Sequence, residues 1–553
     1  MGSRVATLEA VPGSVDQPSG RYPLHPAAFR TYCLLPTAYC LLIFILALGP
    51  RLLARDLFPT SDEDSWMRRS GGFTYGLLNG QLGRTYQNGH PGVTTMWVAT
   101  LSQGPSGALR FADRVHGMRF VGQVPGYLEG LTRARTGFAL LAALGTAVAA
   151  LLLWRLFGPT VALLAGAALA LEPFLVANAQ LVHVDGPLAT FTTVSMLAAL
   201  VRWRTGRGRG FLFISGVTAG LALLSKSPAL FLLLFVPLVA LLPALAQRSW
   251  VRALLDLLIW GGVAVGTVVA FWPALWTLGP TEVLGRIVAF TRETGGQPDE
   301  VGSFFLGVVG ADPGPLYYPV ATLFRLSPFV TLGLVALVLL HRRLAVQTRG
   351  LAGWLLLFVL GFALMMTLGP KKFDRYLLPI FPALVALAAL GWSLVLSGLS
   401  GRLARVAVSG GLLLVAAWPL ASTYPYPLAY YNPLLGGGAT AQRAVMVGNG
   451  EGLDQAAAWI AKQPESADPW VAAHSFDILA AMIPGRGEPL RDGVPSDADY
   501  IVTYGRRIQM QRWGRSLDQY FAENPPIYTV WINGIEYARV HPGPRRAAVG
   551  SRQ

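Results

Sequence analysis

Residues 228–246 read PALFLLLFVPLVALLPALA, a run without a single charged side chain. About 20 apolar helical residues cross the hydrocarbon core of a bilayer, so such a run is typical of a transmembrane helix. Similar runs recur along the chain, and the composition agrees with them. Of the 553 residues, 53% are hydrophobic and 13% are charged, and the mean hydropathy is +0.47. The sequence therefore predicts a polytopic α-helical membrane protein.

About eleven transmembrane helices are predicted. They lie at residues 32–53, 136–156, 159–177, 184–201, 211–226, 228–246, 253–275, 319–340, 351–369, 374–396 and 403–421. These segments define a transmembrane module over residues 32–423. Residues 1–31 are polar and rich in Pro and Gly, which predicts a disordered tail.

Many of the basic residues lie in the loops between these segments. The formal net charge is +15, and arginines gather after the fourth, sixth, eighth and tenth segments. All four loops fall on one side if the segments alternate, and positively charged loops are cytoplasmic. We therefore expect a multi-pass protein of the plasma membrane with a cytoplasmic N-terminal tail. Because topology accounts for the basic residues, no nucleic-acid partner is expected.

Residues 424–553 have the composition of a soluble domain. Strands are predicted at Trp470 and at Tyr500–Tyr504, and a hairpin is predicted to turn at Asn533-Gly534. A helix is expected to begin near Gly452. The segment is therefore predicted to be a small extracytoplasmic α/β domain.

The first outer loop, residues 54–134, carries adjacent carboxylates at Asp62, Glu63 and Asp64, and a histidine at His90. The same topology places further ionisable residues on the outer face, namely His183, Asp185, Lys226, Lys372 and Arg375. Ionisable groups close to hydrocarbon are costly and usually functional. The alternatives are a solvated loop or helix cap for the carboxylates, an ordinary loop histidine for His90 and an N-terminal helix cap for Asp185.

Three of these residues are cations on the side where positive charge is disfavoured. Lys226, Lys372 and Arg375 indicate an anion at the outer boundary, such as a lipid phosphate, or side chains that reach toward headgroups. A transfer reaction with a phosphate leaving group needs one base for the acceptor hydroxyl and cations for the phosphate. The outer face offers that set of groups.

The chain resembles the family-39 glycosyltransferases of the GT-C superfamily, which include protein O-mannosyltransferases and lipid-A aminoarabinose transferases. The resemblance covers about residues 32–421. The residues that carry it are Asp62-Glu63, His90-Pro91-Gly92, the segment from Asn178 to Leu188 with His183 and Asp185, the turn from Leu224 to Pro228, and Arg375-Tyr-Leu-Leu-Pro379.

This resemblance implies a GT-C-like fold and inverting transfer of a sugar from a polyprenyl-phosphate donor to an acceptor hydroxyl on the extracytoplasmic face. It implies that Asp62 is the catalytic base and that Glu63 orients or contacts the acceptor. His90 would lie near the acceptor or sugar, and Lys372 and Arg375 would hold the lipid phosphate. The luminal insert of the mannosyltransferases is absent, which argues against a protein acceptor.

Taken together, the predicted sites are Asp62 and Glu63 for catalysis, His90, His183 and Asp185 for acceptor or sugar binding, and Lys226, Lys372 and Arg375 for lipid phosphate. No cofactor or metal is expected, because the nearer relatives work without metal. The alternative is a divalent cation held by Asp62, Asp64, His183 and Asp185. Expected partners are the donor and membrane lipids.

Two other functions fit parts of the sequence. One is a transporter or flippase of a lipid-linked anion, favoured by the helix break at Lys226-Ser-Pro228. The other is a non-catalytic assembly subunit of the membrane that presents the C-terminal domain.

Overall fold

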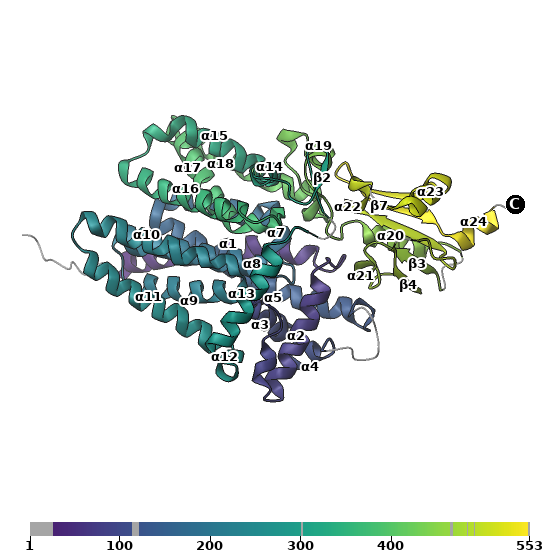
Figure 1. Ribbon diagram of the computed structural model, residues 1–553. Coiled ribbons are helices and arrows are strands. Elements are labelled where there is room, and N and C mark those ends of the chain that lie inside the picture. Colours follow the sequence, from purple (N-terminus) through teal and green to yellow (C-terminus); the bar gives the residue numbers. More distant parts are fainter. Residues whose placement is uncertain are drawn as a thin grey trace, which may run out of the picture. The chain divides into compact units, whose positions relative to one another are not determined.

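A computed structural model describes residues 26–112, 121–299, 302–464, 468–483, 485–491, 493–511 and 513–550 (Figure 1). Most of the predicted tail, residues 1–25, lies outside the described residues. The rest of it belongs to helix α1, Pro26–Leu53. The chain divides into two compact units, Met1–Tyr39 and Cys40–Gln553. The core and the candidate site both belong to the second unit.

Within the described residues, seven helices are long and apolar enough to cross a membrane, or up to nine if each of two bent pairs is one span. The seven spans are Pro36–Leu53 in α1, α5 (Tyr127–Phe157), Ser227–Leu245 in η3 and α10, α11 (Trp250–Phe271), α16 (Val346–Thr367), Asp374–Ser397 in η5 and α17, and α18 (Arg402–Thr423). The bent pairs are α6 (Pro159–Leu171) with α7 (Pro173–Ala179), and α14 (Tyr317–Arg325) with Pro328–Arg343, which comprises α15 (Pro328–Leu340) and η4 (His341–Arg343). The protein is a multi-pass membrane protein.

Helices occupy the other two predicted spans, but these fail the same test. They are α8 (Asp185–Thr205), whose last turn carries Arg202 and Arg204, and α9 (Gly210–Ser225), which has 16 residues. The predicted count of eleven is therefore not confirmed. The two helices pack together through polar contacts, because Ser195 Oγ donates to Ser215 O and Ser215 Oγ donates to Ser195 O, each at 2.9 Å.

The chain breaks where Lys226-Ser-Pro228 predicts a break. Helix α9 ends at Ser225, and Lys226 is extended, with φ −161° and ψ 147°. The 3-10 turn η3 (Ser227–Leu230) then leads into α10 (Phe231–Ala246). Pro228 lacks the N–H that a continuous helix would need, so the new helix starts with proline in its first turn.

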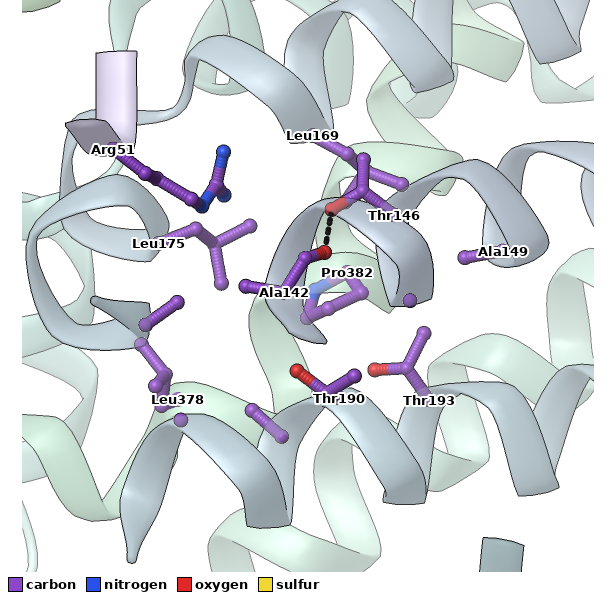
Figure 2. Close-up of a pocket in the computed structure, with 14 residues that line it drawn as sticks. Arg51, Ala142, Thr146, Ala149, Leu169, Leu175, Thr190, Thr193, Leu378 and Pro382 are labelled. Carbon is purple, nitrogen blue, oxygen red and sulfur yellow. Dashed lines mark hydrogen bonds between the residues drawn. The ribbon is translucent and has the colours of Figure 1, made fainter. Parts of the chain in front are cut away.

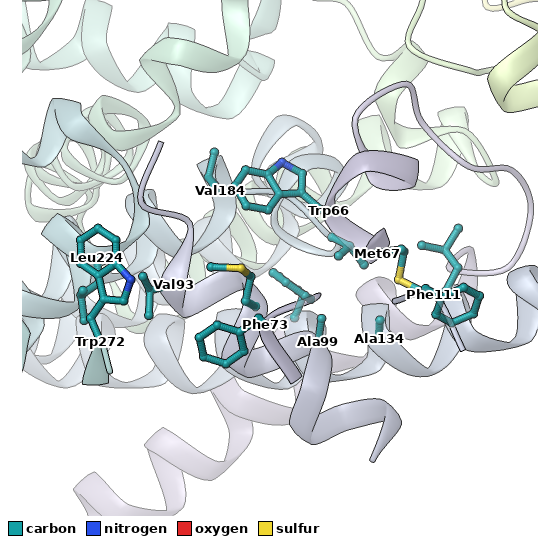
Figure 3. Close-up of a cluster of buried hydrophobic side chains, with 14 of the residues drawn as sticks. Trp66, Met67, Phe73, Val93, Ala99, Phe111, Ala134, Val184, Leu224 and Trp272 are labelled. Carbon is teal, nitrogen blue, oxygen red and sulfur yellow. The ribbon is translucent and has the colours of Figure 1, made fainter. Parts of the chain in front are cut away.

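The first predicted outer loop, residues 54–134, contains helices of its own. It folds into α2 (Glu63–Leu78), η1 (Leu82–Thr85), α3 (Val93–Gln103), α4 (Pro105–Leu109) and η2 (Val121–Gln123). A buried apolar cluster holds these helices together and includes Trp66, Met67, Phe73, Val93 and Phe111 (Figure 3). Such burial contributes roughly 1.5–3 kcal/mol per large side chain and makes the segment a rigid platform.

Residues 274–310 form a second excursion between spans. It contains α12 (Ala274–Thr277), α13 (Pro280–Gly295) and a short antiparallel hairpin of β1 (Ser303–Phe305) and β2 (Val308–Gly310).

The strands predicted near the C-terminus are present in a five-stranded sheet of order β4-β3-β5-β7-β6. Strand β3 pairs in parallel with β4 and β5, while β7 pairs antiparallel with β5 and β6. The strands are β3 (Trp470–Ala473), β4 (Arg486–Pro489), β5 (Tyr500–Tyr504), β6 (Tyr528–Ile532) and β7 (Ile535–Pro542). The predicted hairpin turn is confirmed, with positive φ at Asn533 (50°) and Gly534 (75°), as a type I′ turn requires.

Short helices complete this region. They are η6 (Pro427–Ala429), η7 (Pro433–Leu435), α19 (Gly437–Ala444), α20 (Leu453–Ala461), α21 (Phe476–Leu479), α22 (Gly505–Met510), α23 (Arg515–Glu523) and α24 (Pro544–Gly550). Helix α20 begins directly after Gly452, as expected. The whole segment lies in the same compact unit as the apolar helices, so the predicted domain boundary at residue 424 stays a prediction.

Arg325, the last residue of α14, connects the segment after α18 to the apolar helices through hydrogen bonds. Its guanidinium donates to Leu428 O at 2.8 Å, to Tyr430 O at 2.7 Å and to Asp374 Oδ2 at 2.7 Å. The side chain is almost fully buried, so the carboxylate and the two carbonyls provide the partners that a buried cation needs.

A second buried arginine, Arg51, lies at one end of a small pocket of about 40 Å³ among the apolar helices (Figure 2). It donates to the carbonyls of Ala47 at 2.7 Å and Ala170 at 3.1 Å. Those bonds join the end of α1 to the end of α6 just before the chain enters the Asp62 segment.

Candidate active site

Asp62 lies at the start of α2 and faces an open cavity. Its side chain is 41% exposed, and its Oδ2 accepts a hydrogen bond from Arg375 Nη2 at 2.8 Å. His183 Nε2 is 3.4 Å from the same oxygen. Burial raises the pKa of Asp62, but Arg375 and then His183 outweigh it and hold that pKa well below its usual range. The carboxylate is therefore ionised at neutral pH.

Asp185 is a second carboxylate that contacts the charged groups around Asp62. Its Oδ1 accepts from Lys226 Nζ at 2.7 Å, and its Oδ2 is 3.2 Å from His183 Nδ1 and 3.3 Å from Arg375 Nε. His183 therefore lies between the two aspartates. Burial lowers the pKa of His183, but Asp185 and Asp62 outweigh it, so its pKa lies above its usual value.

Two of the three predicted cations converge here. Lys226 lies over the ring of Tyr376, with Nζ 4.0 Å from its centroid, and Arg375 lies over Phe373 at 4.7 Å. Lys372 does not join them. Its Nζ is paired with Asp312 Oδ1 at 2.7 Å, and it does not line the cavity.

Glu63 points away from the cavity and is completely buried. Its Oε1 accepts from Arg135 Nε at 2.8 Å and from Val182 N at 3.0 Å. Its Oε2 accepts from Thr60 N at 2.8 Å and from Arg135 Nη2. Burial raises the pKa of Glu63, but Arg135 outweighs it and lowers the pKa. Glu63 thus joins the start of α2 to α5 and to the segment that carries His183.

His90 lines the cavity on the side of α13. Its ring lies edge-on to Phe290, with centroids 4.9 Å apart, and its buried Nδ1 has no hydrogen-bond partner among the residues that the structure describes. Burial, and then Lys226, lower the pKa of His90 to about 3, so the ring is neutral. Just beyond it, Gly92 N donates to Ser225 O at 3.1 Å, which sets the start of α3 against the Lys226 turn.

Five of the predicted site residues line one cavity of about 640 Å³, namely Asp62, His90, His183, Lys226 and Arg375. This volume lies within the size range of small-molecule sites. Residues outside the predicted set of site residues also line this cavity. They include Trp66, Arg69, Asn178, Arg325, Lys371, Asn449, Glu451, His474, Ser475, Tyr504, Arg506 and Arg507.

The contribution of the C-terminal segment was missed. His474 and Ser475 follow β3, and Arg506 and Arg507 follow β5, at the carboxyl ends of two neighbouring parallel strands. Ligands of open α/β sheets bind at that edge. The two arginines that follow the buried strand β5 could therefore have predicted that this segment contributes to the site. Ser61 Oγ also donates to Asn449 Oδ1 at 3.0 Å, which links the cavity wall to α2.

The carboxylates do not suit a divalent cation as they stand. Asp185 and Asp62 already bind Lys226 and Arg375, and Asp64 accepts from Gly122 N at 3.0 Å without lining the cavity. No group of three or more His, Cys, Asp or Glu in the part of the chain that the structure describes has the arrangement of a metal site.

The model of the dolichyl-phosphate-mannose-protein mannosyltransferase family matches residues 128–276. The resemblance to family-39 glycosyltransferases is confirmed. The matched segment contains His183, Asp185 and Lys226, and neither Asp62 nor Arg375. No curated protein matches the chain.

Solved structures of glycosyltransferases are similar to this one. ArnT of Cupriavidus metallidurans, crystallised with undecaprenyl phosphate, has 15% identity and a TM-score of 0.47, with 92% of this chain and 98% of that chain covered. The oligosaccharyltransferase AglB of Archaeoglobus fulgidus, in complex with an inhibitory peptide and a dolichol phosphate, has 12% identity and a TM-score of 0.42, with 88% and 72% covered.

Proposed function

We propose that the protein is an inverting glycosyltransferase that moves a sugar from a polyprenyl-phosphate donor to an acceptor hydroxyl on the extracytoplasmic face of the plasma membrane. The observation that carries the proposal is the meeting of Asp62, His183, Lys226 and Arg375 at one cavity. Their segments are far apart in sequence, and together they supply one exposed base beside cations. The family match supports a lipid-linked sugar donor.

The chemistry is a single displacement. The acceptor oxygen attacks the anomeric carbon, the bond from that carbon to the phosphate oxygen breaks, and its electron pair leaves with the polyprenyl phosphate. The acceptor proton passes to the Asp62 carboxylate. Because a phosphate is a stable anion, Lys226 and Arg375 can stabilise its developing charge without a general acid.

Arg375 couples donor binding to the strength of the base. In the structure its guanidinium is shared between Asp62 Oδ2 and Asp185 Oδ2. A donor phosphate competes for the same N–H groups, because a guanidinium binds phosphate in two-pronged fashion. As Arg375 turns to the phosphate, the pKa of Asp62 moves back toward its usual range and the carboxylate becomes a better base.

Glu63 then has a positioning role, since its oxygens are occupied by protein groups. His90 and His183 line the cavity and are assigned to the sugar or acceptor, and Asp185 orients His183, Lys226 and Arg375. We assign the C-terminal segment to the extracytoplasmic side and the N-terminus to the cytoplasm.

The test is release of polyprenyl phosphate by the purified protein from a panel of donors that carry hexoses, including mannose, or aminoarabinose. Asp62→Asn should lower the release rate about 10²–10⁴-fold, the usual contribution of a general base. Asp56→Asn is the matched control, because Asp56 is an exposed carboxylate of the same segment. Wild-type release by folded Asp62→Asn protein would remove Asp62 as the base.

A further inference from the structure

A second cavity adjoins the first and is lined by Arg68, Arg69, Gly72, Tyr75, Arg84, Gln87 and Asn88. We call it the arginine groove. Its volume is about 520 Å³, and two of its lining residues, Arg69 and Asn88, also line the central cavity. The two cavities are therefore neighbours.

The lining of the groove is cationic and hydrophilic. None of its seven residues carries a carboxylate, and none has an aliphatic side chain. Arg68 and Arg69 form no ion pair with any residue that the structure describes. Burial, and then the neighbouring Arg68, lower the pKa of Arg69 to about 10. Arg68 and Arg69 therefore supply positive charge that no described carboxylate pairs with and that an anionic ligand can neutralise.

Aromatic and amide groups accompany the arginines. Arg84 lies over the ring of Tyr75 at 5.1 Å, and Arg69 lies over Trp66 at 4.6 Å. Gln87 donates to Arg84 O at 2.6 Å and packs against Gly72, whose missing side chain leaves room for it. Amides, arginines and ring edges offer hydrogen bonds to hydroxyl and carboxylate oxygens, while the groove lacks an apolar wall for an acyl chain.

The direction of α2 relates the groove to Asp62. Asp62, Trp66 and Arg69 all line the central cavity, and Tyr75 lies farther along the same helix. With a rise of 1.5 Å per residue, Arg69 is about 10 Å and Tyr75 about 20 Å along the helix from Asp62. A ligand that reaches from Asp62 into the groove is therefore elongated.

We propose that the arginine groove binds the acceptor, and that the acceptor is an acidic saccharide whose carboxylate or phosphate lies about 10 Å from the hydroxyl that receives the sugar. This inference rests on the proposed transfer reaction, and it names the class of acceptor for the same site.

The probes are a galacturonic acid tetramer and a neutral glucose tetramer of equal length, each titrated calorimetrically into the purified full-length protein without donor. The acidic tetramer should bind at least tenfold more tightly, and more weakly as salt is raised. In Arg68→Gln/Arg69→Gln protein its Kd should rise at least tenfold. Arg68→Gln alone, which changes an exposed side chain and keeps the fold, should raise the Kd several-fold.

The matched control is Arg133→Gln, because Arg133 is an exposed arginine paired with Glu129 on α5, away from the groove. It should leave the Kd unchanged. Equal binding of the two tetramers, or no effect of the double substitution, would overturn the proposal. Short-chain phosphatidylglycerol is titrated in the same way. If the double substitution weakens binding of this lipid and not of the acidic tetramer, the groove is a lipid headgroup site and the proposal is overturned.

The binding experiment separates this inference from the proposed reaction. Release of polyprenyl phosphate without binding of the acidic tetramer would refute the acceptor class and leave the reaction in place. Specific binding in a protein that never releases polyprenyl phosphate would refute the reaction and leave the anionic site in place.

Discussion

Asp62 and Glu63 are neighbours in the chain with opposite surroundings. Successive helical residues point about 100° apart, so one carboxylate can face the cavity while the next faces the protein interior. Asp62 has 41% of its side chain exposed, whereas Glu63 has none exposed and binds Arg135. One carboxylate thus faces the cavity, while the next is held by buried protein groups.

Glu63→Gln tests that division. The substitution keeps the shape but leaves the buried guanidinium of Arg135 without its counter-charge, which should cost about 3–5 kcal/mol of unfolding free energy. The measurement is unfolding of the purified protein by heat or denaturant. Glu129→Gln, in an exposed pair with Arg133, should change stability by less than about 1 kcal/mol. Unchanged stability with lost transfer would instead make Glu63 a substrate contact.

At the scale of elements, α3 is placed by the glycine that precedes it. Gly92 has a φ of +57°, and a Cβ there would lie 2.2 Å from the ring of Trp66. Trp66 in turn lies edge-on to His183, with centroids 6.4 Å apart. The His90-Pro91-Gly92 sequence therefore fixes both the entry of α3 and the packing behind the histidine.

Gly92→Ala should accordingly lower both stability and transfer. The strained φ alone costs about 1–3 kcal/mol, and displacement of Trp66 should also shift His183 and reduce the rate of release. Gly80→Ala is the control, because Gly80 has a similar φ of +67° with nothing near its would-be Cβ. Melting temperature and release rate are measured for both variants. Equal effects in the two would show that the contact with Trp66 is unimportant.

The apolar spans could be read from the sequence because hydrocarbon demands long uncharged helices. Helix α2 could not, since Ser70-Gly71-Gly72 and its mixed polarity resemble a loop. In the structure a Cβ at Gly71 would lie 2.4 Å from Ala112 N, so glycine permits a close approach that sequence does not reveal. Of the predicted site residues, Lys372 was separated from the others by its pairing with Asp312.

At the scale of the whole molecule, the cavity is assembled from both the helical region and the C-terminal sheet. Topology could place Asp62, Lys226 and Arg375 at one depth, but their meeting depends on tertiary packing. Arg506 and Arg507 gave no periodic signal, because their role comes from the position of β5 in the sheet.

The pKa of Asp477 on α21 depends on the packing of the C-terminal segment against α2. Burial, and then the carboxylate of Asp64 in the first turn of α2, raise its pKa to about 6 from 3.8. Between those pH values the folded protein keeps a proton that the unfolded chain has lost, so stability falls as pH rises through the window. One pKa unit corresponds to about 1.4 kcal/mol, so the loss is about 2–3 kcal/mol.

Asp477→Asn should remove that loss. The variant should unfold at a higher temperature than the wild type at pH 7 and at about the same temperature at pH 4. Melting curves across this range provide the measurement, and Asp497→Asn, an exposed carboxylate of the same segment, should match the wild type throughout. A stability difference that does not vary with pH would rule out titration of Asp477 as its cause.

The long sequence separation between Asp62 and Arg375, 313 positions, has a consequence for biogenesis. A ribosome makes Asp62 first, then Lys226 and then Arg375, and His474 and Arg506 follow all three. A nascent or prematurely terminated chain therefore carries the base without the residues that would hold a donor. If the proposed function holds, chains that stop before Arg375 should be inert toward a lipid-linked sugar.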